Sequence, residues 1–244
     1  MLANALGVLG GMGPLAAADF LAKLAAATDA SCDQEHIPLI LYGDCTTPGR
    51  TASILGQGPS PLPQLLAGIE FLNAARCAVI AIPCNSAHCW YDDMARASRA
   101  PVLHIVEASA QKVRRNNAAT RRVGVLSTEG THRMGIYRVS LERMGFELIA
   151  PTAEDFRELV SPGIADIKGN RIAAAQDRFD VAADRLLARG AEQIILGCTE
   201  IPLGMRRRCA DQPHSVVDST LALAEAVLAH FGASQVPARG AAES

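Results

Sequence analysis

Two of the seven cysteines occupy matching places in the chain, and their settings predict chemistry at both. Cys84 follows one apolar run and precedes a helical stretch at residues 86–97, while Cys198 follows the run 193–196 and precedes another short helix. Each cysteine should therefore lie at the carboxyl end of a parallel strand, where open α/β sheets bind their ligands. The helix N-terminus beside each one favours thiolate over thiol, and its free N–H groups can hold a carboxylate.

Two thiols that face each other across a cleft suit one kind of reaction best. A single nucleophile needs one cysteine and a base, and a redox pair is usually close in sequence, as in a C-x-x-C motif, which does not occur here. Inversion of a carbon stereocentre needs a base on one face of the carbon and an acid on the other, which two opposed thiols supply. The alternative for either cysteine alone is a buried, inert thiol.

The segments around the cysteines predict an α/β fold with parallel sheets. Apolar runs alternate with amphipathic stretches along the chain, and continuously apolar strands are typical of parallel sheets that are covered on both faces. The predicted strands are 6–9, 37–42, 78–82, 102–105, 123–126, 147–149, 193–196 and 215–217, and the predicted helices are 15–28, 62–75, 134–144, 172–189 and 220–231. The segment 43–63 is rich in Gly, Pro and Thr and has no apolar period, so we predict a long functional loop there.

A weak internal repeat divides the chain into two halves. GVLGG at residues 7–11 recurs as GVLST at 124–128, and IAIPCN at 80–85 recurs as IILGCT at 194–199. We therefore predict two pseudo-symmetric, doubly wound lobes with the active site in the cleft between them. The first lobe takes residues 1–106 and 215–232, the second takes residues 107–214, and residues 233–244 form a flexible tail. The alternative is a chance similarity between the two halves of an α/β chain.

Composition and charge narrow the range of partners. The 244 residues include 23 Lys and Arg against 25 Asp and Glu, so no basic field attracts nucleic acid or an anionic membrane. Aromatic residues make up only 4%, and no run of about 18 apolar residues is present to span a bilayer. The first residues, MLANALGVLGGMGP, lack the features of a signal peptide, so we expect a cytoplasmic protein with reduced cysteines.

Three motifs in combination resemble a known family. GVLGGMGP at residues 7–14, PCNSAH at 83–88 and LGCTEIPL at 196–203 are similar to motifs of the aspartate/glutamate racemase family, and above all of its aspartate racemase branch. The resemblance covers the chain from about residue 5 to residue 232. It implies a homodimeric enzyme that racemises aspartate, or also glutamate, with no cofactor and no metal. It also implies that Cys84 and Cys198 are the paired acid and base.

The same resemblance implies where a dicarboxylic amino acid would bind. Arg50, in RTASI at residues 50–54, and Lys168 would hold the side-chain carboxylate, a role that suits the fork of a guanidinium and the point charge of an ammonium. An amide and hydroxyl groups would hold the α-carboxylate and the charge that develops on it. The predicted substrate-binding residues are Met12, Arg50, Asn85, Ser86, Thr128, Thr131, Lys168, Thr199 and Glu200.

Two departures from the family pattern leave the substrate open. Ser86 stands where the family usually has Thr, and Gly49 stands where an acidic residue usually precedes the loop arginine. A maleate isomerase or a hydantoin racemase of the same superfamily is one alternative, because these enzymes share the scaffold. A non-catalytic amino-acid-binding protein that uses the same cleft is another.

Two weaker patterns point to other ligands, and neither is complete. GMGPLA at residues 11–16 matches a dinucleotide-binding fingerprint, but the first acid after the second strand, Asp44, lies too far along the chain. The nearby His88 and Cys89 lack the further ligands that a metal site needs. We therefore expect the glycines to approach a small anionic ligand closely, and expect His88 and Cys89 to be structural.

Overall fold

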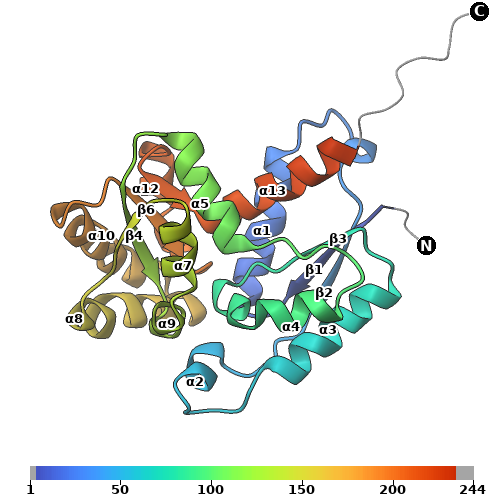
Figure 1. Ribbon diagram of the computed structural model, residues 1–244, viewed down its shortest axis with the longest axis horizontal. Helices are drawn as coiled ribbons and strands as arrows, with labels where there is room; N and C mark the ends of the chain where they lie inside the picture. Colours follow the sequence, from blue (N-terminus) through green and yellow to red (C-terminus); the bar gives the residue numbers. More distant parts are fainter. Residues whose placement is uncertain (1–3, 235–244) are drawn as a thin grey trace, which may run out of the picture.

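The computed structural model describes residues 4–234, which form two lobes with one parallel sheet each (Figure 1). The first sheet has the order β2-β1-β3 and consists of β1 (Leu6–Gly10), β2 (Leu39–Gly43) and β3 (Val79–Ala81). The second has the order β5-β4-β6-β7 and consists of β4 (Arg122–Ser127), β5 (Glu147–Ile149), β6 (Gln193–Gly197) and β7 (Val216–Asp218). Every pairing is parallel, which confirms the predicted fold class.

The two sheets match in register as well as in order. Val8 of β1 pairs with Ala81 of β3, and at the equivalent place in the repeat Val125 of β4 pairs with Ile195 of β6. Because the registers agree, the chain leaves both sheets at equivalent points, a few residues before each cysteine. The pseudo-symmetry of the strands therefore carries the two thiols to equivalent places at the carboxyl edges of the two sheets.

Helices of very different lengths surround the sheets. The long ones are α1 (Pro14–Ala27), α3 (Leu62–Ala74), α5 (Ile105–Asn116), α10 (Ile172–Ala188) and α13 (Ser219–Ser234). The shorter ones are α2 (Arg50–Ile54), α4 (Tyr91–Ala97), α6 (Glu129–Met134), α7 (Ile136–Arg143), α8 (Ala153–Asp155), α9 (Ser161–Lys168), α11 (Ile201–Gly204) and α12 (Arg206–Asp211). Tighter 3-10 turns occupy Asp33–Glu35 and Asn85–Trp90, and a π-helical turn occupies Phe156–Val160.

The strand predicted at residues 102–105 is wrong. Only an isolated bridge joins Val102 to Ile80, and α5 begins immediately afterwards, at Ile105. The apolar run PVLHIV at residues 101–106 joins the bridge to the first turn of α5, and for this reason it has the pattern of a strand. The sequence prediction missed α5 altogether because its start is hidden in that run.

Three further boundaries differ from the prediction. The single helix predicted at 134–144 is divided between α6 and α7, because Gly135 adopts a left-handed conformation with φ 68°. The predicted loop 43–63 contains the short helix α2. The stretch predicted as a helix at residues 86–97 begins as a 3-10 turn and becomes α-helical only at Tyr91. Of the predicted tail, residues 233–234 complete α13, and residues 235–244 lie outside the described residues.

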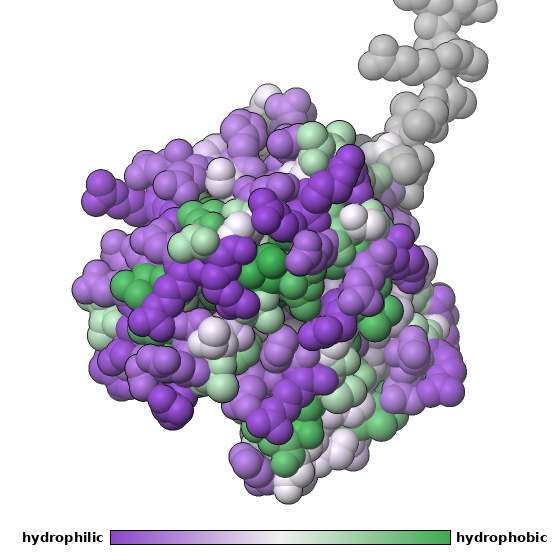
Figure 2. Space-filling model, turned by 60° about the vertical axis from the view of Figure 1, so that its left-hand side comes forward, coloured by the Kyte–Doolittle hydropathy of each residue, from purple (hydrophilic) through white to green (hydrophobic). Residues whose placement is uncertain are grey.

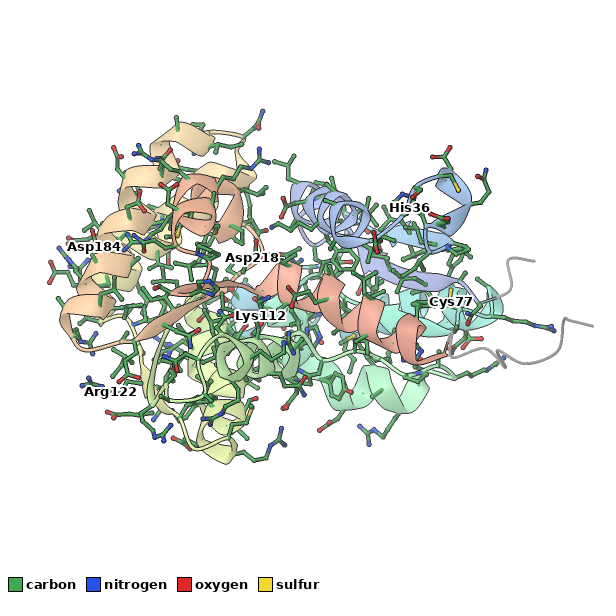
Figure 3. All side chains as sticks on the ribbon, turned by 90° about the horizontal axis from the view of Figure 1, so that it is seen from above. His36, Cys77, Lys112, Arg122, Asp184 and Asp218 are labelled. Atoms are coloured by element: carbon green, nitrogen blue, oxygen red, sulfur yellow. The ribbon has the colours of Figure 1, made fainter. Side chains whose placement is uncertain are left out.

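The two lobes are joined by α13 and by ion pairs. β7 lies within the segment 215–232 that we expected in the first lobe, yet it pairs with β6 of the second sheet, whereas α13 packs against α1 and α5. We therefore propose that the second lobe extends to Asp218 and that α13 alone returns to the first. Lys23 of α1 contacts Asp218 at 2.6 Å, and Lys112 of α5 contacts Glu225 of α13 at 2.5 Å. Lys112 and Asp218 both lie where the lobes meet (Figure 3).

One hydrophobic core runs through both lobes. Its buried residues come from α1, α5, α7 and α13 and from strands of both sheets, including Phe20, Val79, Val123, Tyr137 and Leu223. Separate clusters fill the outer part of each lobe. Because the central cluster is continuous, the lobes are fixed to each other by burial of apolar surface and not only by the connecting chain.

The surface outside the site gives little sign of a membrane. Among residues 4–234, no helix combines the length and the apolar character that a membrane crossing requires. Figure 2 shows a face on which hydrophilic residues predominate and hydrophobic residues form small patches. The exposed large hydrophobic side chains come from different elements: Leu15, Leu41, Phe71, Met134, Val139, Ile172 and Val181. Scattered residues of this kind are normal on a folded protein.

Gly68 allows α3 to lie directly on the first sheet, and its replacement gives a test of this packing. A Cβ at Gly68 would overlap Leu9 Cδ1 and lie 3.1 Å from Tyr42 Cδ1, whereas at Gly232 of α13 no described atom lies within 4 Å. We expect Gly68→Ala to lower the free energy of unfolding by about 1–3 kcal/mol. Gly232→Ala should leave it unchanged or raise it by less than about 1 kcal/mol. Urea denaturation of both variants measures the difference, and equal effects would contradict the packing.

Candidate active site

A cavity of about 140 Å³ lies between the lobes, and both strand-end cysteines line it. Cys84 comes from the first lobe and Cys198 from the second, and each side chain is almost completely buried. The other predicted site residues that line the cavity are Met12, Arg50, Asn85, Ser86, Thr128, Lys168, Thr199 and Glu200. Gly49, Thr51 and Ala52 of the loop and α2 also line it, although the sequence analysis did not name Thr51 or Ala52.

Thr131 is the predicted site residue that does not line this cavity. Its hydroxyl lies 3.0 Å from Ser86 Oγ and 2.9 Å from Thr128 Oγ1, and Thr128 in turn lies 3.2 Å from Ser86 Oγ. The backbone N–H of Thr131 donates to Thr128 Oγ1 at 3.1 Å, so Thr128 caps α6. The three hydroxyls therefore join the lobes, and Thr131 supports the two that face the cavity.

The segment that carries Cys84 is held by a buried histidine. Cys84 lies just before the 3-10 turn, and the Nδ1–H of His88 donates to its carbonyl oxygen at 2.9 Å. The backbone N–H of Ile105 donates to His88 Nε2 at 3.3 Å, so the neutral ring satisfies both contacts in a single tautomer. Burial, assisted by the neighbouring His104, lowers the pKa of His88 to about 3. His88 is thus a neutral structural residue behind the cavity.

The thiol of Cys198 has a carboxylate partner. It donates to Glu200 Oε2 at 3.0 Å, and Lys168 Nζ lies 3.7 Å from the other oxygen, Glu200 Oε1. Burial raises the pKa of Cys198 well above its usual value, and the negative charge of Glu200 raises it further, while Lys168 opposes the shift. The expectation of a favoured thiolate is therefore wrong for Cys198 in the unliganded protein. The helix that follows, α11, is a single turn and starts only after Glu200, so its dipole is too small and too distant to offset this burial.

Arg50 is held by backbone carbonyls and keeps one donor free. Its Nη1 donates to the carbonyl oxygens of Thr47 at 3.2 Å and Pro48 at 3.1 Å, and its Nη2 donates to that of Met12 at 2.9 Å. These oxygens orient the guanidinium where Gly49 supplies no acidic side chain. Nε is buried and has no hydrogen-bond partner among the described residues. An anion in the cavity could therefore accept a hydrogen bond from Arg50, but part of the predicted fork is already used.

The glycine-rich turn after β1 approaches the protein itself. Gly11 has φ 86°, and a Cβ there would lie 2.5 Å from the backbone of Asp44. Gly13 has φ 125°, and a Cβ there would lie 2.7 Å from Glu200 Oε1. The expectation that these glycines serve an approach to a ligand is therefore replaced by packing against the loop and against the partner of Cys198. Within residues 4–234, no group of three or more His, Cys, Asp and Glu side chains is placed to hold a metal ion.

The buried histidine pair predicts how stability depends on pH. The pKa of His88 is lowered from 6.5 to about 3 and that of His104 to about 4, so the unfolded chain binds more protons than the folded one below pH 6.5. Stability should therefore fall as the pH decreases through this window, by at most about 1.4 kcal/mol per pH unit for each histidine. His88→Gln keeps a donor for Cys84 and should show a shallower slope in urea denaturation. Equal slopes for the variant and the wild type would show that His88 is not held neutral.

Comparisons with known proteins give the family of the chain. The model of the family Asp/Glu/Hydantoin racemase matches residues 9–227. The broad specificity amino-acid racemase RacX of Bacillus subtilis is 26% identical over 235 residues, which cover 94% of this chain and 99% of that protein.

Solved structures agree with the family match. An aspartate racemase of Picrophilus torridus superposes with a TM-score of 0.82 at 27% identity, covering 93% of this chain and 94% of that one. A glutamate racemase of Francisella tularensis in complex with D-glutamate has a TM-score of 0.72 at 16% identity, covering 98% and 86%, and shows the shared fold alone. The chain belongs to the Asp/Glu/hydantoin racemase family.

Proposed function

We propose that the protein racemises an acidic amino acid, aspartate or glutamate, by a two-base mechanism that needs neither pyridoxal phosphate nor a metal. One observation carries the proposal: Cys84 and Cys198, from equivalent places in the two lobes, line the same small cavity together with Arg50 and Lys168. Groups related by pseudo-symmetry face the region between the lobes from opposite sides. A Cα held in the cavity is then within reach of one thiol on each face.

The α-carboxylate is held on the hydroxyl side of the cavity. Ser86 and Thr128 present hydroxyl groups there, and Asn85 and Thr199 add an amide and a further hydroxyl. Removal of the Cα proton moves negative charge onto this carboxylate, which becomes enolate-like. Donors that already point at the carboxylate stabilise that charge without reorganisation, which is how preorganised polar groups lower a barrier.

The two thiols have different roles at the start of a turnover. Cys198 is a thiol hydrogen-bonded to Glu200, so it is ready to give a proton to one face of Cα while Cys84, as the thiolate, removes the proton from the other face. After this step Cys84 carries the proton and Cys198 is the thiolate. For the reverse direction Cys198 acts as base and Cys84 as acid, and Glu200 with Lys168 balances the charge beside Cys198. The raised pKa of Cys198 supports its role as the acid in the first of these directions.

Arg50 and Lys168 select a substrate with a second carboxylate. Lys168 is about half exposed and already lies near Glu200, whereas the unpartnered Nε of Arg50 is buried. Arg50 is therefore the stronger contact for the distal carboxylate. The partners in this proposal are a small dicarboxylic amino acid and a second copy of the chain. The homodimer stays a prediction from the family resemblance.

Replacement of Arg50 tests the substrate side chain. We expect Arg50→Ala to lower kcat/KM for aspartate about a hundredfold, because the buried distal carboxylate loses its charged partner. Turnover of alanine, which lacks that carboxylate, should change little, and this second substrate separates recognition from a general disturbance of the loop. Arg157→Ala, at an exposed arginine outside the cavity, serves as the matched control. Unchanged kinetics with aspartate would remove Arg50 from the site.

Replacement of each cysteine tests the pair. Cys84→Ser and Cys198→Ser should each lose racemisation by about a thousandfold or more, because serine is too weak an acid to replace a thiol in a unit of two groups. Each variant should still exchange the Cα proton of one enantiomer with solvent deuterium, and the preferred enantiomer should differ between the two variants. Cys209→Ser, at a half-buried thiol outside the cavity, is the control and should keep full activity. Near-normal racemisation by either variant, or the same exchange preference in both, would refute the two-base assignment.

A further inference from the structure

A buried tyrosine outside the cavity touches the segments of both thiols. Tyr137 of α7 is only 3% exposed, and its hydroxyl donates to Asn85 Oδ1 at 2.6 Å, next to Cys84 in the chain. Its ring lies against Gly197, which precedes Cys198: a Cβ at Gly197 would be 2.8 Å from Tyr137 Cε2 and 3.2 Å from Tyr137 Cζ. The tyrosine therefore connects the residue after one thiol with the residue before the other.

The hydrogen bonds around Asn85 fix which way its amide points. Asn85 Nδ2 donates to Ser219 Oγ at 3.0 Å, and the hydroxyl of Ser219 donates its only proton to the carbonyl oxygen of Leu196 at 2.7 Å. Ser219 can therefore only accept from Asn85, and Tyr137 can only donate to it. With Oδ1 and one Nδ2–H used in this way, a single Nδ2–H of Asn85 is left for the cavity.

The hydroxyl of Tyr137 stays a donor under ordinary conditions. Burial raises the pKa of Tyr137 above its usual value, so the phenol does not ionise near neutral pH. Without this hydroxyl, Oδ1 of Asn85 would be buried beside an apolar ring and would lose its partner. The amide could then turn over, which would place an acceptor where the α-carboxylate needs a donor.

We propose that Tyr137 is a positioning residue for racemisation, which holds the Asn85 amide with one N–H directed at the α-carboxylate of the substrate. This inference rests on the proposed function. Tyr137 acts through Asn85 and does not touch the substrate, since it does not line the cavity. The close fit at Gly197 has a matching purpose, because only a glycine there lets the ring lie where its hydroxyl reaches Asn85.

A double-mutant cycle between Tyr137 and Asn85 tests the proposal. We expect Tyr137→Phe to raise KM for aspartate and to lower kcat/KM about tenfold, the effect of losing one well-placed hydrogen bond to the substrate. In an Asn85→Ala background, the same change at Tyr137 should have almost no effect on kcat/KM, because the group that it positions is already gone. A purely structural tyrosine would lower activity equally in both backgrounds.

Two further variants serve as control and as second route. Tyr91→Phe removes another partly buried tyrosine hydroxyl, one that donates to the carbonyl oxygen of Val102 at 3.0 Å, and should leave the kinetics unchanged. Gly197→Ala keeps every hydrogen-bonding group but forces the ring to move, so it should show the same loss as Tyr137→Phe, and again only when Asn85 is present. This second route also covers a Tyr137→Phe protein that fails to fold.

The outcomes separate this inference from the function on which it rests. If the wild type does not racemise aspartate or glutamate, the proposed function fails. If the wild type racemises aspartate but Tyr137→Phe stays within about twofold of it, or loses as much activity without Asn85 as with it, the positioning role of Tyr137 is overturned.

Discussion

Burial of two thiols in one small cavity is the constraint on which the rest of this structure depends. A thiol in an apolar, water-poor setting resists ionisation, and Cys198, buried beside a carboxylate, has a raised pKa for this reason. Such a group gives up or takes a proton usefully only when its partner atoms are placed to within a few tenths of an ångström. The segments that carry the two thiols come from different lobes, so the geometry between the lobes must be as firm as that within either sheet.

Several features supply that firmness. The hydrophobic core is continuous from one lobe to the other, and α13 runs from the second sheet back to α1 of the first lobe (Figure 1). On the cavity side, the hydroxyls of Ser86, Thr128 and Thr131 join the lobes within hydrogen-bonding distance, and Tyr137 packs between the two thiol-bearing segments. The loop with Arg50 crosses as well, because α2 packs on α6, where a Cβ at Gly130 would lie 3.1 Å from Thr51 Cα.

The parts of this arrangement that depend on local sequence were predictable. The strands, the repeat and the position of Cys84 and Cys198 at equivalent strand ends follow from apolar runs and from register, which are short-range properties. The direction of the pKa shift at Cys198 was not predictable in this way, because it depends on burial and on the rotamer that brings Glu200 to the thiol. The family pattern identified Arg50, but its three backbone carbonyl partners depend on how the loop folds.

Tyr137 shows the limit of the sequence most clearly. It is 52 residues from Asn85 in the chain, and it lay within a predicted helix with nothing to distinguish it from a core aromatic residue. The only local trace is Gly197, a glycine at the end of an otherwise bulky strand, and a glycine there has several possible explanations. Contacts between distant segments of this kind carry no periodicity, so they emerge only when the fold is known.

The most direct test of the two-base account is the early course of the wild-type reaction in deuterium oxide. L-Aspartate is incubated with the enzyme, the reaction is stopped after a small fraction has been converted, and deuterium at Cα is measured in each separated enantiomer by NMR. If the proton is removed on one face and returned on the other by a second thiol, the D-aspartate formed carries deuterium while the remaining L-aspartate does not. Deuterium appearing in the remaining L-aspartate as fast as D-aspartate forms, or D-aspartate that keeps its original proton, would contradict the account.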